Sequence, residues 1–360
     1  ELLDDTLHQR QRSLRDSLDS YFQRHALSLA ACSELQQARQ RKWFQEQAAV
    51  QYRNIRKLMA TDLPHTIPDL PMNQAYLEPS FFCEALGLQG RMDCLFSGSG
   101  QYTIVEQKAG KGAFVSPSSP SFQPDVPAIQ DKHWVQLLLY RAIFIYGFDK
   151  HSSAMRHLFL LYSRYAKGLV LTAQSPSLLL RAIRLRNLIV WCEMGYADGG
   201  YDLLCHLHPD QFRNSRCSER FWRQWKEPEL RQLLQPFRDA RPLELAYVLR
   251  FMRFVQRERL LARMGNRLQE NAGFASIWLD SLEEKKAAGN ICDDLELTHI
   301  GGTAEGVDQV SLRFSSSQDV DGSNFRPGDI VILYPYRRGT VPNACAQMVI
   351  RAGIEEMGKE

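Results

Sequence analysis

The sequence of 360 residues has no apolar run long enough to cross a membrane. Its eight cysteines include no Cys-x-x-Cys pair, so neither a zinc site nor a disulfide framework is indicated. A G-x-x-x-x-G-K-[ST] segment is also missing, which argues against ATP hydrolysis through a P-loop. The charge balance is nearly even, 44 Lys and Arg against 41 Asp and Glu, so composition alone does not indicate a nucleic-acid-binding protein.

What the sequence does contain is typical of a globular chain. It is 44% hydrophobic and 24% charged, and its length suffices for two or more domains. The start, ELLDDTLHQRQR, lacks the apolar centre of a signal peptide, which predicts a cytoplasmic protein without membrane contact. Because the sequence starts without Met and stops in VIRAGIEEMGKE, predicted to form an amphipathic helix, we expect a fragment of a longer protein.

Four regions are predicted from the pattern of apolar residues, proline and glycine. They are an N-terminal helical region (1–60), an α/β core that begins with the connector TDLPHTIPDLP (61–175), a second helical region (176–290), and a module of short strands with a terminal helix (291–360). Within the core, RMDCLF, YTIVEQK, HLFLLYS and GLVLTA are expected strands, and HWVQLLLYRAIFIYG is an expected helix. The segment GKGAFVSPSSPSFQPDVPAIQ between them is an expected loop.

Residues 87–114, GLQGRMDCLFSGSGQYTIVEQKAGKGAF, place three charged side chains in a predicted hairpin. Side chains alternate along a strand, so Glu106 and Lys108 share one face, and the hairpin brings Asp93 opposite Glu106. One interpretation is an exposed Glu106–Lys108 ion pair, which contributes little. The apolar neighbours favour a buried site instead, where two carboxylates require a divalent cation. Oxygen ligands indicate Mg²⁺ or Mn²⁺, and a lysine beside such a metal points to phosphodiester hydrolysis.

The motifs of this region resemble those of the PD-(D/E)XK nuclease superfamily. Asp93 followed by Glu106-Gln107-Lys108 resembles its Asp…Glu-x-Lys motif, GLQGRMD its G-x-x-G-x-x-D strand, and VEQKAGK its E-x-K-[ST]-G-K segment. Gln136 and Tyr140 resemble the Q-x-x-x-Y helix of the RecB-like branch. The resemblance implies a restriction-endonuclease-like mixed sheet with extensive helical additions.

The same resemblance implies a role for each residue. Asp93, Glu106 and the carbonyl of Gln107 would hold the metal, and Lys108 would position the attacking water. Gln136 would support that lysine or the water. Tyr140 would line the DNA path, or else be a core residue with its hydroxyl at the surface.

More distant features resemble the nuclease part of a superfamily 1 DNA helicase-nuclease. Glu84 lies where such proteins carry a Glu ahead of the glycine-bearing strand, and SNFRPGDIVILYPY resembles their small β-barrel-like module. A helicase motor would then follow in the full-length chain. The implied partner is DNA, at single-stranded ends or flaps, during repair or replication.

Two features depart from that family. Its upstream metal-binding His has a glycine-bearing context that His8, His25 and His65 all lack; His25 is the best candidate, against a solvated or capping histidine. The three downstream cysteines are too widely spaced for the family's iron–sulfur cluster, so none is expected; they are Cys192, Cys205 and Cys217.

A stripe of arginines lies outside these motifs. Arg250, Arg253 and Arg257 share one face of a predicted helix and either contact a DNA backbone or form a solvated surface.

Two functions remain open for the whole chain. The chain is either a Mg²⁺- or Mn²⁺-dependent DNA nuclease or a catalytically degenerate nuclease-fold module that binds nucleic acid or scaffolds a helicase.

Overall fold

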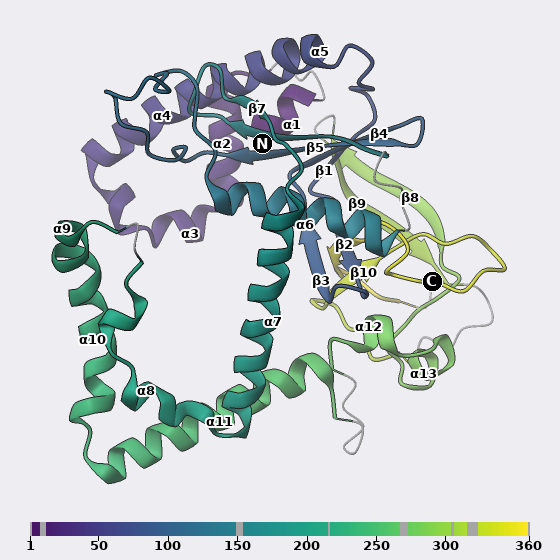
Figure 1. Cartoon of the computed structure of the whole chain (residues 1–360). Helices are drawn as coiled ribbons and strands as arrows, with labels where there is room; N and C mark the ends of the chain where they lie inside the picture. The colour runs from purple at the N-terminus through teal and green to yellow at the C-terminus, as the bar shows by residue number, and fades with distance from the viewer. Residues whose placement is uncertain are drawn as a thin grey trace. The chain divides into compact units, whose positions relative to one another are not determined.

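The chain forms a mixed α/β structure, seen in a computed structural model (Figure 1). It divides into two units, Glu1–Leu179 with Ser281–Glu360 and, inserted between them, Leu180–Asp280. We call them unit 1 and unit 2. The structure describes residues 2–7, 12–148, 154–214, 217–266, 273–303, 306–314 and 323–358.

The core of unit 1 is a five-stranded mixed sheet with the order β1-β4-β5-β6-β7. Its strands are β1 (Ala75–Leu77), β4 (Cys94–Gly98), β5 (Gln101–Lys108), β6 (Met155–Tyr162) and β7 (Leu169–Leu171). Neighbours are antiparallel except β5 and β6, which are joined through α6 (Asp131–Gly147) because parallel strands need a long crossover. The strands β4 to β7, the helix α6 and the long loop before it are as the sequence predicts, whereas β1 was not predicted.

The turn between β4 and β5 fixes the register of this hairpin. Ser99 and Gly100 have φ angles of 49° and 74°, the left-handed conformation that two-residue hairpin turns require at both central positions. Cys94 consequently pairs with Val105.

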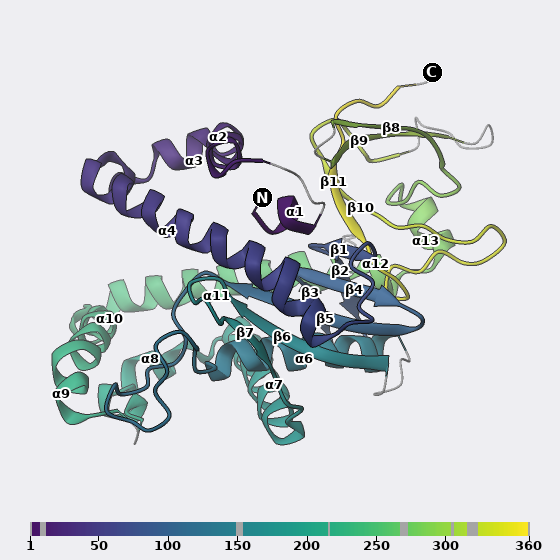
Figure 2. The ribbon, with the colours of Figure 1, turned by 90° about the horizontal axis from the view of Figure 1, so that it is seen from above.

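The two faces of the sheet bury alternate residues of β5. Ile104 packs with Leu137 and Ile143 of α6, whereas Val105 packs with Leu58 and Met59 on the opposite face. Figure 2 shows α4 (Ala38–Lys57) and α6 on the two sides of the strands. Glu106 and Lys108 lie two and four residues after Ile104 on the same strand, so their side chains also point toward α6.

The N-terminal helical region is confirmed. It contains α1 (Leu2–Leu7), α2 (Leu14–Arg24), α3 (Ala26–Ala30) and α4, and Ser13 and Asp16 form a capping box at the start of α2. The connector predicted at residue 61 is wrong in its first half. A π-helical turn (Leu58–Asp62) and α5 (Leu63–Thr66) continue the helix, because Pro64 falls in the first turn, where no N–H is needed.

A second hairpin, β2 (Ser80–Cys83) and β3 (Leu88–Arg91), packs against α6. Its close approach depends on Gly90. A methyl group added there would lie 2.9 Å from Cε1 of Tyr140 and 3.1 Å from Cδ1 of Ile143. The glycine of the G-x-x-G-x-x-D motif thus makes room for a helix side chain.

The C-terminal part of unit 1 follows α13 (Leu282–Ala287). β8 (Glu296–Thr303) pairs with β9 (Gly306–Arg313), and β10 (Ile330–Leu333) pairs with β11 (Ile350–Gly353). The predicted terminal helix is therefore wrong, since residues 350–353 form a strand. Pairing with the edge of β10 outweighs a weak helical pattern that contains Gly353.

Unit 2 is helical, as the sequence predicts. Its elements are most of α7 (Pro176–Asp198), α8 (Leu203–His206), α9 (Glu219–Phe221), a π-helical turn (Trp222–Lys226), α10 (Glu227–Asp239), α11 (Pro242–Met264) and α12 (Ser276–Leu279). Buried Gln256 of α11 donates a hydrogen bond to the Glu193 carbonyl of α7. Among the helices of the described ranges, none is both long and apolar enough to cross a membrane.

We predict that Gly90→Ala lowers the free energy of unfolding by about 1 to 3 kcal/mol, because the added methyl group overpacks the core. The matched control is Gly110→Ala, where a methyl group meets nothing within 4 Å. Urea denaturation measures both. Equal stability of the two variants would contradict the tight packing of β3 on α6.

Candidate active site

Asp93 and Glu106 meet where β4 begins beside β5. Asp93 directly precedes Cys94, whose partner is Val105, so Asp93 lies opposite Glu106. The Gln107 N–H donates to Asp93 Oδ2 at 2.7 Å, and the Asp93 N–H donates to Glu106 Oε2 at 3.3 Å. The convergence predicted from the hairpin is confirmed.

Lys108 closes the cluster from the same face of β5. Its Nζ donates to Glu106 Oε1 at 2.7 Å and to Gln136 Oε1 of α6 at 2.9 Å. Gln136 Nε2 in turn donates to Glu106 Oε1 at 2.7 Å. The side chains of Glu106 and Lys108 are 3% and 18% exposed, so the interpretation as an exposed ion pair is wrong.

Tyr140 supports this cluster from one helical turn further along α6. Its hydroxyl donates to the Arg91 carbonyl at 2.6 Å and accepts a hydrogen bond from Gln136 Nε2 at 2.8 Å. The residue is buried, so the predicted surface hydroxyl is wrong. Burial raises the pKa of Tyr140 to about 12, which keeps the hydroxyl a proton donor at physiological pH. Tyr140 therefore fixes Gln136 against β3.

The cluster holds two carboxyl groups and one ammonium. Burial raises the pKa of Asp93 despite the hydrogen bond from Gln107, and burial together with the charge of Asp93 raises the pKa of Glu106 despite Lys108. Within the described part of the chain, Asp93 Oδ1 accepts no hydrogen bond. Ionisation of both acids leaves a surplus negative charge that a cation would compensate.

The available donors fit a hard divalent cation. Asp93, Glu106 and the carbonyl of Gln107 offer oxygen atoms only, the ligands that Mg²⁺ and Mn²⁺ prefer. No group of three or more His, Cys, Asp or Glu suited to a metal occurs among the residues that the structure describes. Two carboxylates suffice for Mg²⁺, which keeps several waters and takes further oxygens from a substrate phosphate.

Other predicted residues do not join the cluster. His25 is exposed at the junction of α2 and α3, where its ring lies 4.6 Å from that of Tyr21; it is not part of a described metal group. His8 lies outside the described residues. Glu84 is exposed in the turn that joins β2 to β3, and the predicted arginine stripe is exposed on α11 in unit 2.

The structure adds two contributors to which the sequence analysis assigned no role. The backbone carbonyl of Arg91 accepts the hydrogen bond of the Tyr140 hydroxyl. A pattern of side chains in the sequence cannot predict this backbone contact. His133 lies one turn before Gln136, and its Nδ1 is 2.9 Å from the Tyr162 hydroxyl. Burial and the nearby Lys108 ammonium lower the pKa of His133. Its spacing from Gln136 is the only sequence signal for its position.

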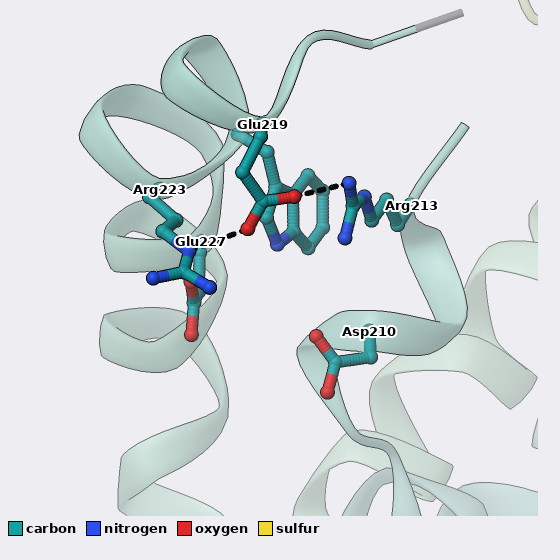
Figure 3. A pocket seen from close by; sticks show the side chains of 6 residues that line it. Asp210, Arg213, Glu219, Arg223 and Glu227 are labelled. Carbon is teal, nitrogen blue, oxygen red and sulfur yellow. Dashed lines mark hydrogen bonds and ion pairs between the residues drawn. The ribbon is translucent and has the colours of Figure 1, made fainter. Parts of the chain in front are cut away.

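A pocket in unit 2 offers a contrast to this cluster (Figure 3). It is lined by Asp210, Arg213, Glu219, Trp222, Arg223 and Glu227. Its three acidic residues are balanced by three arginines: Glu219 pairs with Arg213 and Arg223, and Glu227 pairs with Arg231. This pocket therefore has no surplus charge that calls for a cation.

No protein-family model, curated protein or solved structure matches the chain. The chemical interpretation of the cluster consequently depends on its own geometry and on the motifs that it contains.

We predict that Asp93→Asn raises the free energy of unfolding of the metal-free protein by about 1 kcal/mol at pH 7. Asparagine can still accept the hydrogen bond from Gln107 while the surplus charge disappears. The raised pKa means that ionising Asp93 costs stability, a cost absent below its unfolded pKa and complete above its folded pKa. The advantage of the variant over the parent should therefore grow as pH rises.

Denaturation in EDTA across a pH series measures this difference. Lys108→Met is the opposing control, since it leaves both carboxylates without a counter-charge and should lower stability at pH 7. Added Mn²⁺ should stabilise the parent and not Asp93→Asn. A stability difference that stays constant with pH would contradict the assigned charge imbalance.

Proposed function

We propose that this chain is a metal-dependent nuclease that hydrolyses phosphodiester bonds of DNA at single-stranded ends or flaps. The observation that carries the proposal is the convergence of Asp93, Glu106 and Lys108 within hydrogen-bonding reach on one partly buried face. A structural ion pair needs only one acid, and a second, partly buried acid adds a desolvation cost. Perturbed groups clustered in this way are typical of functional sites.

The proposal extends to the fold and its context. A mixed sheet with helices on both faces supports a restriction-endonuclease-like core. The strands available for the proposed small β-barrel-like module form two separate pairs, β8–β9 and β10–β11. In this proposal the full-length chain is a cytoplasmic helicase-nuclease of DNA repair or replication, with its motor beyond the present residues.

Each residue of the cluster has a separate role in the proposed reaction. Asp93, Glu106 and the Gln107 carbonyl would hold Mg²⁺ or Mn²⁺, which when bound supplies positive charge toward the scissile phosphate. An ammonium has three N–H donors, of which Glu106 and Gln136 use two. The third can orient the attacking water or a phosphate oxygen, and Gln136 keeps the ammonium aimed there.

A degenerate module that binds nucleic acid without cleaving it is the competing function. What favours it is the position of His25, which does not join the carboxylates. Against it stands the ammonium of Lys108, which the two contacts to Glu106 and Gln136 hold in a defined position. Cleavage decides between the two functions, because both allow DNA binding.

We predict cleavage of an end-labelled single-stranded DNA in Mn²⁺ or Mg²⁺ and none in EDTA. Lys108→Ala should lower the rate about 100-fold or more, the usual effect of removing one transition-state donor. Lys132→Ala is the matched control, because Lys132 is exposed on the same end of α6. Metal binding without cleavage would support the degenerate module, and cleavage that survives Lys108→Ala would remove the assigned role.

We further predict that Tyr140→Phe lowers kcat about tenfold while KM for the strand changes little. The variant keeps the ring that packs in the core but loses the hydroxyl bonds to Arg91 and Gln136, so the lysine is held less well. Steady-state kinetics separate the two constants. A rise in KM with unchanged kcat would instead support the earlier interpretation that Tyr140 lines the DNA path.

A further inference from the structure

Helix α11 of unit 2 presents a row of aromatic rings to solvent. Tyr247, Phe251 and Phe254 are 70%, 55% and 55% exposed, and their spacing of four and three residues places them on one ridge. The Tyr247 and Phe251 centroids are 6.3 Å apart with planes 11° from parallel, and those of Phe251 and Phe254 are 6.0 Å apart. Burying aromatic area is a large source of binding free energy.

Basic residues form a second ridge beside the aromatic one. Arg250, Arg253 and Arg257 are exposed and follow one another at three and four residues, about 100° around the helix from the rings. Arg253 is steadied by a hydrogen bond from Nε to the Ala197 carbonyl at 3.3 Å. Five arginines and two glutamates give α11 a formal charge of +3; they are Arg250, Arg253, Arg257, Arg259 and Arg263 with Glu244 and Glu258.

A third side of the helix is already used within unit 2. Gln256 is buried and bonds to the Glu193 carbonyl of α7. The aromatic ridge lies on a different side, since Phe251 and Phe254 are about 140° and 160° from Gln256 around the helix. The rings are therefore not the face with which α11 packs on α7.

We propose that the aromatic and arginine ridges of α11 bind single-stranded DNA, with bases stacked on the rings and phosphates along the arginines. A single strand carries exposed flat bases beside regularly spaced negative charges, which matches the two adjacent ridges. Duplex DNA keeps its base faces stacked internally. A second copy of this helix would bring another net charge of +3 against the first.

This inference deepens the proposed function, on which it rests for the choice of DNA as the ligand, but it does not depend on cleavage. Binding is therefore measured in EDTA. If the strand binds through α11 but is not cut in Mn²⁺, the inference stands and the nuclease proposal fails. If the strand is cut but the α11 variants bind it as tightly as the parent, the nuclease proposal stands and the inference about α11 fails.

The test is fluorescence anisotropy of a labelled oligothymidylate with the 360-residue chain. The triple variant Tyr247→Ala, Phe251→Ala, Phe254→Ala should bind at least about tenfold more weakly, because each stacked base contributes appreciably, and should keep the salt dependence of the parent. The triple variant Arg250→Gln, Arg253→Gln, Arg257→Gln should lower the slope of log affinity against log salt by about 2.

An abasic strand of equal length isolates stacking. It should bind the parent more weakly than the oligothymidylate and should not distinguish the parent from the aromatic variant. Val248→Ala with Val255→Ala, two exposed apolar residues on the same helix, is the matched control and should bind as the parent does; circular dichroism verifies folding of each variant.

Three results would overturn the inference. The first is an aromatic variant that binds the strand like the parent. The second is a valine variant that weakens binding as much as the aromatic one, since this indicates a general apolar face. The third is a self-associating parent that the aromatic variant converts to a monomer with unchanged DNA affinity.

Discussion

Asp93 and Glu106 bring two carboxyl groups into a partly buried site that contains one ammonium, Lys108. Charges in such surroundings cost folding free energy unless they are neutralised or strongly hydrogen bonded. The Gln107 N–H of β5 offsets part of this cost by a hydrogen bond to Asp93. Lys108 and Gln136 offset another part by their hydrogen bonds to Glu106. The remaining imbalance is the physical reason to expect a cation, and the neighbouring structure serves to keep these groups together.

A chain of contacts links the glycine motif to the lysine. Gly90 leaves space for the ring of Tyr140, whose hydroxyl bonds to the next residue of β3 and to Gln136, and Gln136 holds Lys108. Each link removes a degree of freedom from the following side chain, so the ammonium is oriented by packing as much as by charge. A single methyl group added at Gly90 should thus disturb the position of Lys108 as well as stability.

The sequence predicted those parts of the site that depend on local periodicity. Alternation along β5 placed Glu106 with Lys108, and a tight turn placed Asp93 opposite them. The contact between Tyr140 and the Arg91 carbonyl was not predictable, because it depends on how hairpin β2–β3 packs on α6. Residues 350–353 were predicted as helix for a similar reason, since the pairing edge of β10 is distant in sequence. Local pattern cannot report partners that only tertiary structure supplies.

The position of Lys108 bears on whether the cluster serves metal retention or reaction. An ammonium 2.7 Å from Glu106 competes with a cation for the same carboxylate, so a site adapted only to hold metal would be better served by a neutral or acidic residue there. In the proposed function the ammonium would be useful once a phosphodiester is bound, because that substrate would add negative charge for the cation and the lysine to share. Retaining Lys108 at the expense of metal affinity is therefore more consistent with a site for phosphodiester chemistry than with a structural metal site.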